Sequence, residues 1–261
     1  MTSPSPADLT VVIPTYNERD RLAELVTQLF AAAGAAGLAL ELVVVDDNSP
    51  DGTGALADEL ARSYRVRVVH RAGKLGLGTA VVAGFGAAGA DIVGVMDADF
   101  SHPPALVPVM FAAFRKTGAD VLVASRYVRG GSTPNWPFKR RLLSRVACLL
   151  ARPLSPIRDA ASGFFLIRRT IAQRVTIKAG GFKICLELIV RAWPTTLVEL
   201  PYRFDDRELG ESKMSTREAA GYLVQLKDLY LLRWSKFGRP KREYRQLTPE
   251  DVAALVAPAT R

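Results

Sequence analysis

The sequence predicts an α/β fold built on a mainly parallel central sheet with helices on both faces. Between Leu9 and Ser125, short apolar runs rich in β-branched residues alternate with longer segments whose apolar residues recur at helical spacing. This alternation is typical of parallel strands joined by right-handed helical crossovers. A chain of 261 residues can form one sizeable domain with a full core, or one domain with an appendage.

Predicted strands and helices alternate in order along the first half of the chain. The apolar runs are predicted strands at Leu9–Pro14, Leu40–Asp46, Val66–His70, Ile92–Met96 and Asp120–Ser125. The segments between them are predicted helices at Glu18–Ala33, Gly54–Tyr64, Thr79–Gly89 and Pro104–Lys116. Because parallel strands buried on both faces read as nearly continuous apolar runs, these segments fit the interior of such a sheet.

The pattern changes after Ser125. Gly130–Pro134 has the composition of a mobile loop. Helices are predicted at Phe138–Arg152, Lys183–Trp193 and Glu218–Trp234, and strands at Phe164–Ile167 and Leu197–Phe204. We expect a catalytic domain over residues 1–215, including the basic helix 138–152. Residues 216–261 are predicted to form an amphipathic helix followed by a basic tail.

The net charge of +9 is concentrated in two segments. Between Arg115 and Arg152 there are nine Lys and Arg residues against one acid, Asp120, and a second basic cluster spans Arg233–Arg245. Such patches suit phosphates, nucleic acid or an anionic membrane surface. A nucleic-acid-binding module is disfavoured, because no recognition motif occurs and the aromatic residues are not interleaved with the basic runs.

The cysteines and the N-terminus favour a cytoplasmic compartment. Cys148 and Cys185 have neither metal-binding spacing nor a disulfide framework. The first ten residues lack the basic start and apolar stretch of a signal peptide. No uncharged apolar run approaches the roughly 20 residues that span a bilayer. We therefore expect a soluble or peripheral protein.

Polar clusters follow each of the five predicted strands of the first half. They are Pro14–Glu18, Asp46–Gly52, Gly73–Gly78, Asp97–Asp99 and Ser125–Tyr127. Turns are often polar, which would explain any one cluster but explains all five poorly. Because ligands of open parallel sheets bind at the carboxyl ends of the strands, the clusters predict one large site.

Asp97 and Asp99 are the predicted metal ligands of this site. An Asp-X-Asp pair at a strand end brings two carboxylates together, and their mutual repulsion is relieved by a divalent cation. Mg²⁺ or Mn²⁺, which binds oxygen and bridges to substrate phosphates, suits this arrangement.

The other polar clusters are a less specific signal for nucleotide binding than Asp97 and Asp99 are for metal binding. No P-loop motif and no dinucleotide-binding GxGxxG occurs at the required place. Asp46 or Asp47 could hydrogen-bond a ribose or a base edge, or could simply form a turn. The glycine-rich segment Lys74–Thr79 precedes a helix and offers backbone N–H groups to an anion.

Eight segments together carry a resemblance to a known family. VVIPTYNE, VVVDDNSPDGT, KLGLGTA, MDADFSHPP, ASRYV, the basic segment Lys139–Arg145, ASGF and DRELGESKM occur in this order. The order resembles that of family 2 glycosyltransferases of the GT-A fold. More narrowly, the chain resembles dolichol- or polyprenol-phosphate mannosyltransferases. The resemblance extends from about Leu9 to Met214, most of the chain.

The resemblance implies roles for individual residues. The nucleotide would be held by Pro14, Tyr16, Glu18, Asp47 and Asp97. The metal would be bound by Asp97, Asp99 and, less directly, Ser101, which stands where some relatives have glutamine. Arg126 would face the donor phosphates or the acceptor as a catalytic residue. Arg140 and Ser144 would bind the acceptor phosphate, and Arg207 and Lys213 would close over the donor.

The reaction implied by the resemblance is transfer of mannose from GDP-mannose to a polyprenyl monophosphate with inversion. This acceptor is already anionic, so it needs no general base. A sugar-hydroxyl acceptor is an alternative that would need one, and Glu187 is the nearest candidate by order along the chain. UDP-glucose with the same type of acceptor is a second alternative, and a non-catalytic sensor of sugar nucleotides is a third.

Two predicted helices could reach the bilayer that holds such a lipid, at its cytoplasmic face. In 138–152, Phe138, Leu142, Val146, Leu149 and Leu150 share one side of a basic helix. The last helix offers Leu223, Leu226, Leu229, Tyr230 and Trp234. Packing of these faces on the core is the alternative, and for the last helix a partner subunit is another. A separate membrane-anchoring subunit is a further candidate partner.

Overall fold

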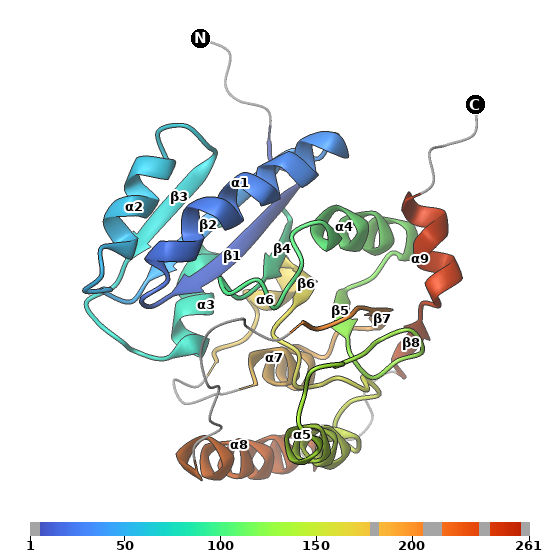
Figure 1. Ribbon diagram of the computed structural model, residues 1–261. Coiled ribbons are helices and arrows are strands. Elements are labelled where there is room, and N and C mark those ends of the chain that lie inside the picture. Colours follow the sequence, from blue (N-terminus) through green and yellow to red (C-terminus); the bar gives the residue numbers. More distant parts are fainter. Residues whose placement is uncertain (1–5, 178–182, 206–215, 235–240, 257–261) are drawn as a thin grey trace.

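The computed structural model describes residues 6–177, 183–205, 216–234 and 241–256 (Figure 1). Its strands are β1 (Leu9–Thr15), β2 (Leu40–Asp46), β3 (Val66–His70), β4 (Ile92–Val95), β5 (Val121–Ser125), β6 (Phe165–Arg168), β7 (Thr196–Pro201) and β8 (Glu243–Gln246). The five strands predicted in the first half of the chain are confirmed, as are the two predicted after it.

The helices follow the predicted order. They are α1 (Arg19–Ala35), α2 (Thr53–Leu60), α3 (Leu77–Ala87), α4 (Leu106–Thr117), α5 (Phe138–Ala151), α6 (Arg169–Ala172), α7 (Ile184–Ala192), α8 (Thr216–Trp234) and α9 (Pro249–Val256). Most lie between consecutive strands, as the crossover arrangement requires.

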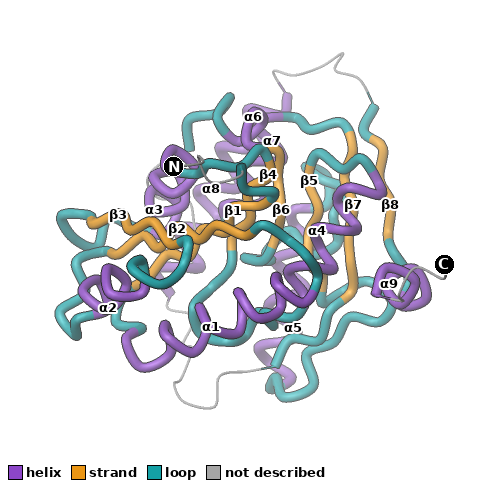
Figure 2. The backbone as a smooth tube through the Cα atoms, turned by 90° about the horizontal axis from the view of Figure 1, so that it is seen from above, coloured by secondary structure: helices purple, strands orange, loops and turns teal. Residues whose placement is uncertain are grey.

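The described strands form one sheet in the order β3-β2-β1-β4-β6-β5-β7-β8 (Figure 2). Strand β6 pairs antiparallel with β4 and β5, and the remaining strand pairs are parallel. The predicted mainly parallel sheet is therefore confirmed. Because β6 is flanked by β4 and β5, these two strands run in the same direction. The carboxyl ends of β1 to β5 consequently meet at one edge of the sheet.

Helices cover both faces of the sheet (Figure 1). Apolar residues of α1, α2, α4 and α9 pack on one face, and those of α3, α6 and α7 pack on the other. Helix α3 lies unusually close to β1, since a Cβ built on Gly84 would stand 2.2 Å from Cγ1 of Val12. This close approach fixes the glycine-rich turn before α3 at the same sheet edge as the end of β1.

The prediction of a basic tail after residue 234 was wrong for residues 243–256. Strand β8 extends the sheet beside β7, and α9 packs against the apolar layer that contains α4. The sequence Glu243–Gln246 lacks an apolar run, because an edge strand buries only part of its side chains. The predicted boundary at residue 215 lies outside the described residues, so the division into two domains stays a prediction.

Helices α5 and α8 form a third layer below α7 (Figure 1). The hydroxyl of Tyr222 donates to the carbonyl of Ala147 at 2.7 Å, and that of Tyr230 donates to the carbonyl of Leu150 at 2.6 Å. These bonds hold the two helices side by side.

Candidate active site

The turn after β4 carries the two predicted metal ligands. The backbone N–H of Asp97 donates to Nδ1 of His102 at 2.9 Å, and that of Ser101 donates to Oδ1 of Asp99 at 3.0 Å. Between them, Phe100 has a φ of 62°, a left-handed conformation that is unfavourable for a bulky residue. The Asp97 side chain is 43% exposed, whereas Asp99 is buried. The turn therefore presents one carboxylate to solvent and fixes the other.

His102 is a positioning residue that the sequence reasoning missed, although it lies within the quoted MDADFSHPP segment. Its ring is buried and stacks on Phe164 with a centroid distance of 4.7 Å. Burial lowers the pKa of His102, although the nearby Asp97 and Asp99 oppose this. The neutral ring accepts the Asp97 N–H at Nδ1, so its proton resides on Nε2, 3.9 Å from the Asp97 carboxylate.

The two carboxylates fit a divalent metal ion whose remaining coordination positions are filled by the substrate and water. The described residues contain no group of three His, Cys, Asp or Glu side chains that could hold a metal ion. Mg²⁺ commonly takes one or two carboxylates and fills its other positions with substrate phosphates and water. Asp97 and Asp99 match this need. Ser101 is buried, and ligation by its hydroxyl stays a prediction.

The ends of β1 and β2 bring the predicted nucleotide-binding residues close together. Pro14 pairs with Val45 of β2, and the exposed ring of Tyr16 lies under Nζ of Lys74 at 4.2 Å. The backbone N–H of Glu18 donates to the Thr53 hydroxyl at 3.0 Å. The structure thus gathers these residues at one edge, and their contact with a nucleotide stays a prediction.

The two neighbouring acids after β2 have different surroundings. Asp46 accepts from the backbone N–H of Ser49 at 3.1 Å, so it forms a turn. Asp47 lies 2.7 Å from Nη1 of Arg71. Burial raises the pKa of Asp47, although Arg71 opposes this. Arg71 also donates to Thr79 at 2.6 Å, and so ties Asp47 to the glycine-rich turn. Sequence reasoning missed Arg71, whose only signal was its place after β3.

Arg126 follows β5 and forms a buried ion pair with Asp159. Its Nε and Nη2 donate to the two carboxylate oxygens at 2.7 and 2.6 Å, and its backbone N–H donates to Oδ2 at 2.9 Å. Burial alone lowers the pKa of Arg126, but Asp159 outweighs this and raises it above its ordinary value. Asp159 was not predicted, since it lies 33 residues away in the sequence.

The two predicted acceptor-binding residues lie on α5 beside Arg126. The guanidinium of Arg140 stands 4.1 Å from the ring centroid of Trp136, and that of Arg126 stands 5.2 Å from the same ring. Tyr127, next to Arg126, donates its hydroxyl to Oγ of Ser144 at 2.6 Å. Arg126 and Arg140 are therefore linked through Trp136, and Ser144 through Tyr127, whereas their binding of an acceptor phosphate stays a prediction.

The model of the family described as "Glycosyl transferase family 2" matches residues 10–184. The chain belongs to glycosyl transferase family 2. The predicted glycosyltransferase activity is therefore confirmed at the level of the family.

The relatives of this glycosyltransferase also bear out the narrower resemblance. A dolichol-phosphate mannosyltransferase of Pyrococcus furiosus is 41% identical over 230 residues, which cover 87% of this chain and 64% of that protein. The chain therefore spans slightly less than two thirds of that relative. A polyprenol monophosphomannose synthase of Mycolicibacterium smegmatis is 42% identical over 217 residues, which cover 78% of this chain and 80% of the relative.

Solved structures confirm the GT-A type of fold. Glucosyl-3-phosphoglycerate synthase from Mycobacterium tuberculosis, in complex with Mn²⁺, UDP and its glucosylated product, aligns with a TM-score of 0.63. The alignment covers 87% of this chain and 80% of that one, at 20% sequence identity. At this identity the likeness concerns the fold, and the bound metal is a property of that enzyme.

Of three further residues considered in the sequence, the structure describes one, Glu187. Arg207 and Lys213, predicted to close over the donor, lie outside the described residues. Glu187 of the glycosyltransferase is buried in the contact between α7 and α8. Its carboxylate accepts from Arg191 at 2.7 Å and from Gln225 at 2.9 Å, which gives it a structural role.

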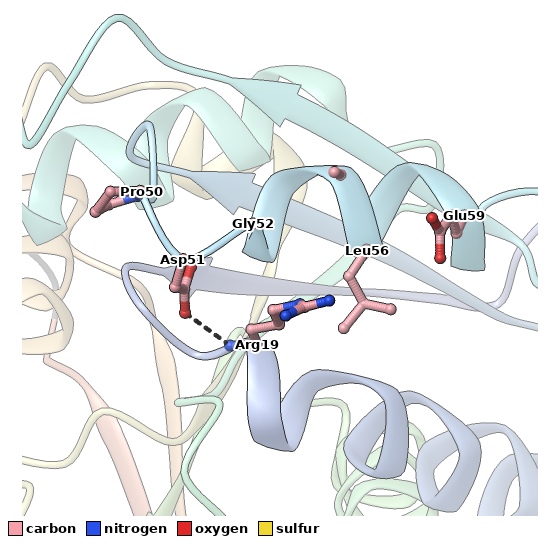
Figure 3. A pocket seen from close by; sticks show the side chains of 7 residues that line it. Arg19, Pro50, Asp51, Gly52, Leu56 and Glu59 are labelled. Atoms are coloured by element: carbon pink, nitrogen blue, oxygen red, sulfur yellow. Dashed lines mark hydrogen bonds between the residues drawn. The ribbon is translucent and has the colours of Figure 1, made fainter.

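A hollow of about 350 Å³ lies between the start of α1 and α2 (Figure 3). Its lining is formed by Arg19, Pro50, Asp51, Gly52, Ala55, Leu56 and Glu59. The backbone N–H of Arg19 donates to Asp51, another lining residue, at 3.2 Å (Figure 3). Pro50, Asp51 and Gly52 belong to the predicted cluster Asp46–Gly52, whereas none of the residues to which the sequence assigned an individual role lines the hollow.

Proposed function

We propose that this glycosyltransferase transfers mannose from GDP-mannose to a polyprenyl monophosphate, with inversion to a β-linked product. One observation carries the proposal. Arg126 and Arg140 both contact the ring of Trp136, and Ser144 bonds Tyr127 next to Arg126, on and beside a helix whose apolar residues are exposed. This arrangement suits an acceptor that combines a phosphate with a lipid tail.

Asp97 and Asp99 would hold the Mg²⁺ or Mn²⁺ ion, with Ser101 as the candidate third ligand. The ion, when bound, stabilises the negative charge that develops on the leaving diphosphate. His102 fixes the turn through the Asp97 N–H. Such preorganised groups need little rearrangement during the reaction, which is how electrostatic stabilisation becomes effective.

The acceptor phosphate would be held against the donor by cationic groups. Arg126 and Arg140 reduce the repulsion between two anions, and Ser144 can donate its own proton because it accepts the hydroxyl proton of Tyr127. An ionised phosphate oxygen attacks the anomeric carbon directly, so no general base is required. The engagement of Glu187 with Arg191 and Gln225 supports this assignment over a sugar-hydroxyl acceptor.

The nucleotide would lie on Pro14, Tyr16, Glu18 and Asp47, with Arg207 and Lys213 closing over the donor. Asp47 offers a buried carboxylate at the end of β2, which suits the N–H groups of a guanine base. Arg71 orients this carboxylate. GDP-mannose is proposed on the strength of the relatives, whose names specify mannosyl or monophosphomannose transfer.

The acceptor tail would reach the enzyme through an apolar surface formed by α5 and α8. The sequence-predicted side of α5 is exposed, with Phe138 at 75% and Leu149 at 68%. Leu223 and Trp234 of α8 are also exposed, whereas the expected contacts Leu226 and Leu229 are buried in the core. For Leu226 and Leu229 the alternative of packing on the core therefore holds.

Charges accompany this apolar surface. Lys139 and Arg145 of α5 are exposed beside it, a combination typical of helices that bind at a membrane interface. We propose peripheral binding at the cytoplasmic face, where both cysteines would remain the free thiols they are here. A membrane-anchoring subunit is the second candidate occupant. Within the described residues, no helix is long and apolar enough to cross a membrane.

The test is a donor panel with a short polyprenyl phosphate. GDP-mannose, UDP-glucose and other radiolabelled nucleotide sugars are incubated with the enzyme and Mg²⁺ or Mn²⁺, and the lipid-extractable label is counted. We expect label from GDP-mannose. Label from UDP-glucose alone would reassign the donor. No lipid-extractable product from any donor would refute the acceptor assignment.

The membrane proposal has its own measurement. Sedimentation with vesicles containing anionic lipid is expected to recover the protein, and recovery should fall when Leu149 is changed to Glu. Leu75→Glu is the matched control, because Leu75 is also exposed, at 57%, but lies in the turn before α3. Equal recovery of both variants would contradict binding through α5.

A further inference from the structure

Trp136 lies in the loop between β5 and α5, and its role is not explained by packing alone. The residue is only 7% exposed, and its ring meets Phe204 edge-on at 5.3 Å. The indole Nε1 is buried and has no hydrogen-bond partner among the described residues. An unpaired buried donor is unfavourable, so such a group usually has a ligand or water as its partner.

The ring of Trp136 also contacts both arginines of the proposed acceptor site. Arg140 stands 4.1 Å and Arg126 stands 5.2 Å from the ring centroid. Both distances are within the range of cation–π attraction, which favours placement of a guanidinium over an indole face. The same side chain therefore positions cationic groups that come from the loop after β5 and from α5.

The polar groups gathered here are mainly donors. Asp159 accepts from Nε and Nη2 of Arg126, and Ser144 accepts from Tyr127, which leaves the Ser144 proton to be donated elsewhere. Arg126 has Asp159 as its acceptor, whereas the indole N–H of Trp136 has none among the described residues and the Ser144 proton is left to donate. A phosphate monoester supplies several acceptor oxygens and a negative charge in one group.

We propose that Trp136 is a further acceptor-binding residue: its indole N–H donates to the acceptor phosphate, and its ring holds Arg140 in place. The inference rests on the proposed function and deepens it. The donor diphosphate carries the same chemistry, so the experiment must separate the two sources of phosphate.

Steady-state transfer by the full chain separates them. Trp136→Phe keeps an aromatic face but lacks the N–H. We expect its KM for a short polyprenyl phosphate to rise about tenfold, which is the loss of one charge-assisted hydrogen bond. Its kcat and its KM for GDP-mannose should stay within about twofold, an allowance for indirect effects. Trp193→Phe is the matched control, because that ring also stacks on two arginines, Arg233 and Arg242, but lies at the end of α7.

A binding measurement avoids any change at Trp136. The chain has three tryptophans, so the double variant Trp193→Phe with Trp234→Phe retains Trp136 as its single indole. Its fluorescence is titrated with the short polyprenyl phosphate and with the matching polyprenol, which lacks phosphate. We expect a saturable change in emission with the phosphate and none with the alcohol.

The outcomes distinguish the inference from the proposed function. Equal emission changes with phosphate and alcohol, or an unchanged acceptor KM in Trp136→Phe, would overturn the role of Trp136 while transfer by the wild type stands. A raised KM for GDP-mannose alone would assign the N–H to the donor and also overturn it. If the wild type transfers no sugar to the lipid, the proposed function fails, and the titration still decides whether Trp136 reports phosphate binding.

Discussion

The ion pair between Arg126 and Asp159 allows a stability prediction that can be worked from distances. Asp159 is fully buried, and the Arg126 side chain is 8% exposed. Three N–H groups of Arg126 donate to this one carboxylate, at 2.6 to 2.9 Å. Asp159→Asn keeps the shape of the side chain but removes its charge, so it tests the electrostatic contribution without creating a cavity.

Removing one partner of a buried pair costs about 3–5 kcal/mol, because the other charge stays buried without compensation. The amide oxygen of Asn can still accept part of the hydrogen bonding, so we expect the lower end, about 3 kcal/mol. For a chain of this size, that change lowers Tm by about 6–12 °C. The site should be affected as well, since Asp159 orients the Arg126 guanidinium, which we propose to face the acceptor.

The measurement is denaturant unfolding followed by circular dichroism, with Tm as a second reading. Asp205→Asn is the matched control, because Asp205 pairs with Arg203 at 2.9 Å but its side chain is 53% exposed. Exposed pairs contribute little, so the control should lie within about 1 kcal/mol of the wild type. An unfolding free energy for Asp159→Asn that equals that of the control would refute this reasoning.

Three other predictions concern the proposed metal site, Asp120 and Glu187. Asp99→Ala, or removal of divalent metal by a chelator, should lower sugar transfer at least about 100-fold. Added Mn²⁺ should restore transfer after chelation but not in the variant. Unchanged transfer by the variant would contradict the metal assignment. Burial would raise the pKa of Asp120, but hydrogen bonds from Thr195 and Thr196 lower it overall. The stabilising effect of the ionised Asp120 is thus present above about pH 4 and is lost as the pH falls further. Asp120→Asn should flatten that part of the measured profile of unfolding free energy against pH. Glu187→Gln should reduce Tm while leaving kcat within a few-fold, whereas abolished transfer by folded protein would favour a hydroxyl acceptor.

Much of the fold could be predicted because the sequence pattern of each strand lies within a few consecutive residues and is the same from strand to strand. Each of β1 to β5 is a short apolar run with a polar end, so its identity depends on a few consecutive residues. The antiparallel direction of β6 and the existence of β8 could not be predicted in this way. Strand direction depends on which partners are available, and β8 gains its stability from pairing with β7.

The predicted metal-binding and nucleotide-binding residues differ in how far the sequence alone could describe their surroundings. Asp97 and Asp99 stand two residues apart, so their proximity follows from the chain itself. The choice between Asp46 and Asp47 was open, because both follow the same strand. The structure distinguishes their surroundings through Arg71, which approaches Asp47 from the end of β3. Such a contact depends on the pairing of β2 with β3.

The sequence by itself determined a carboxylate pair at a strand end, a basic helix and the family to which the chain belongs. These features reside in neighbouring residues or in the order of motifs. Only the tertiary structure paired Arg126 with Asp159 and brought Trp136 within reach of both Arg126 and Arg140. The reason is physical: charges and rings interact over a few ångströms in space, and the packing of loops on the sheet decides which distant residues come within that range.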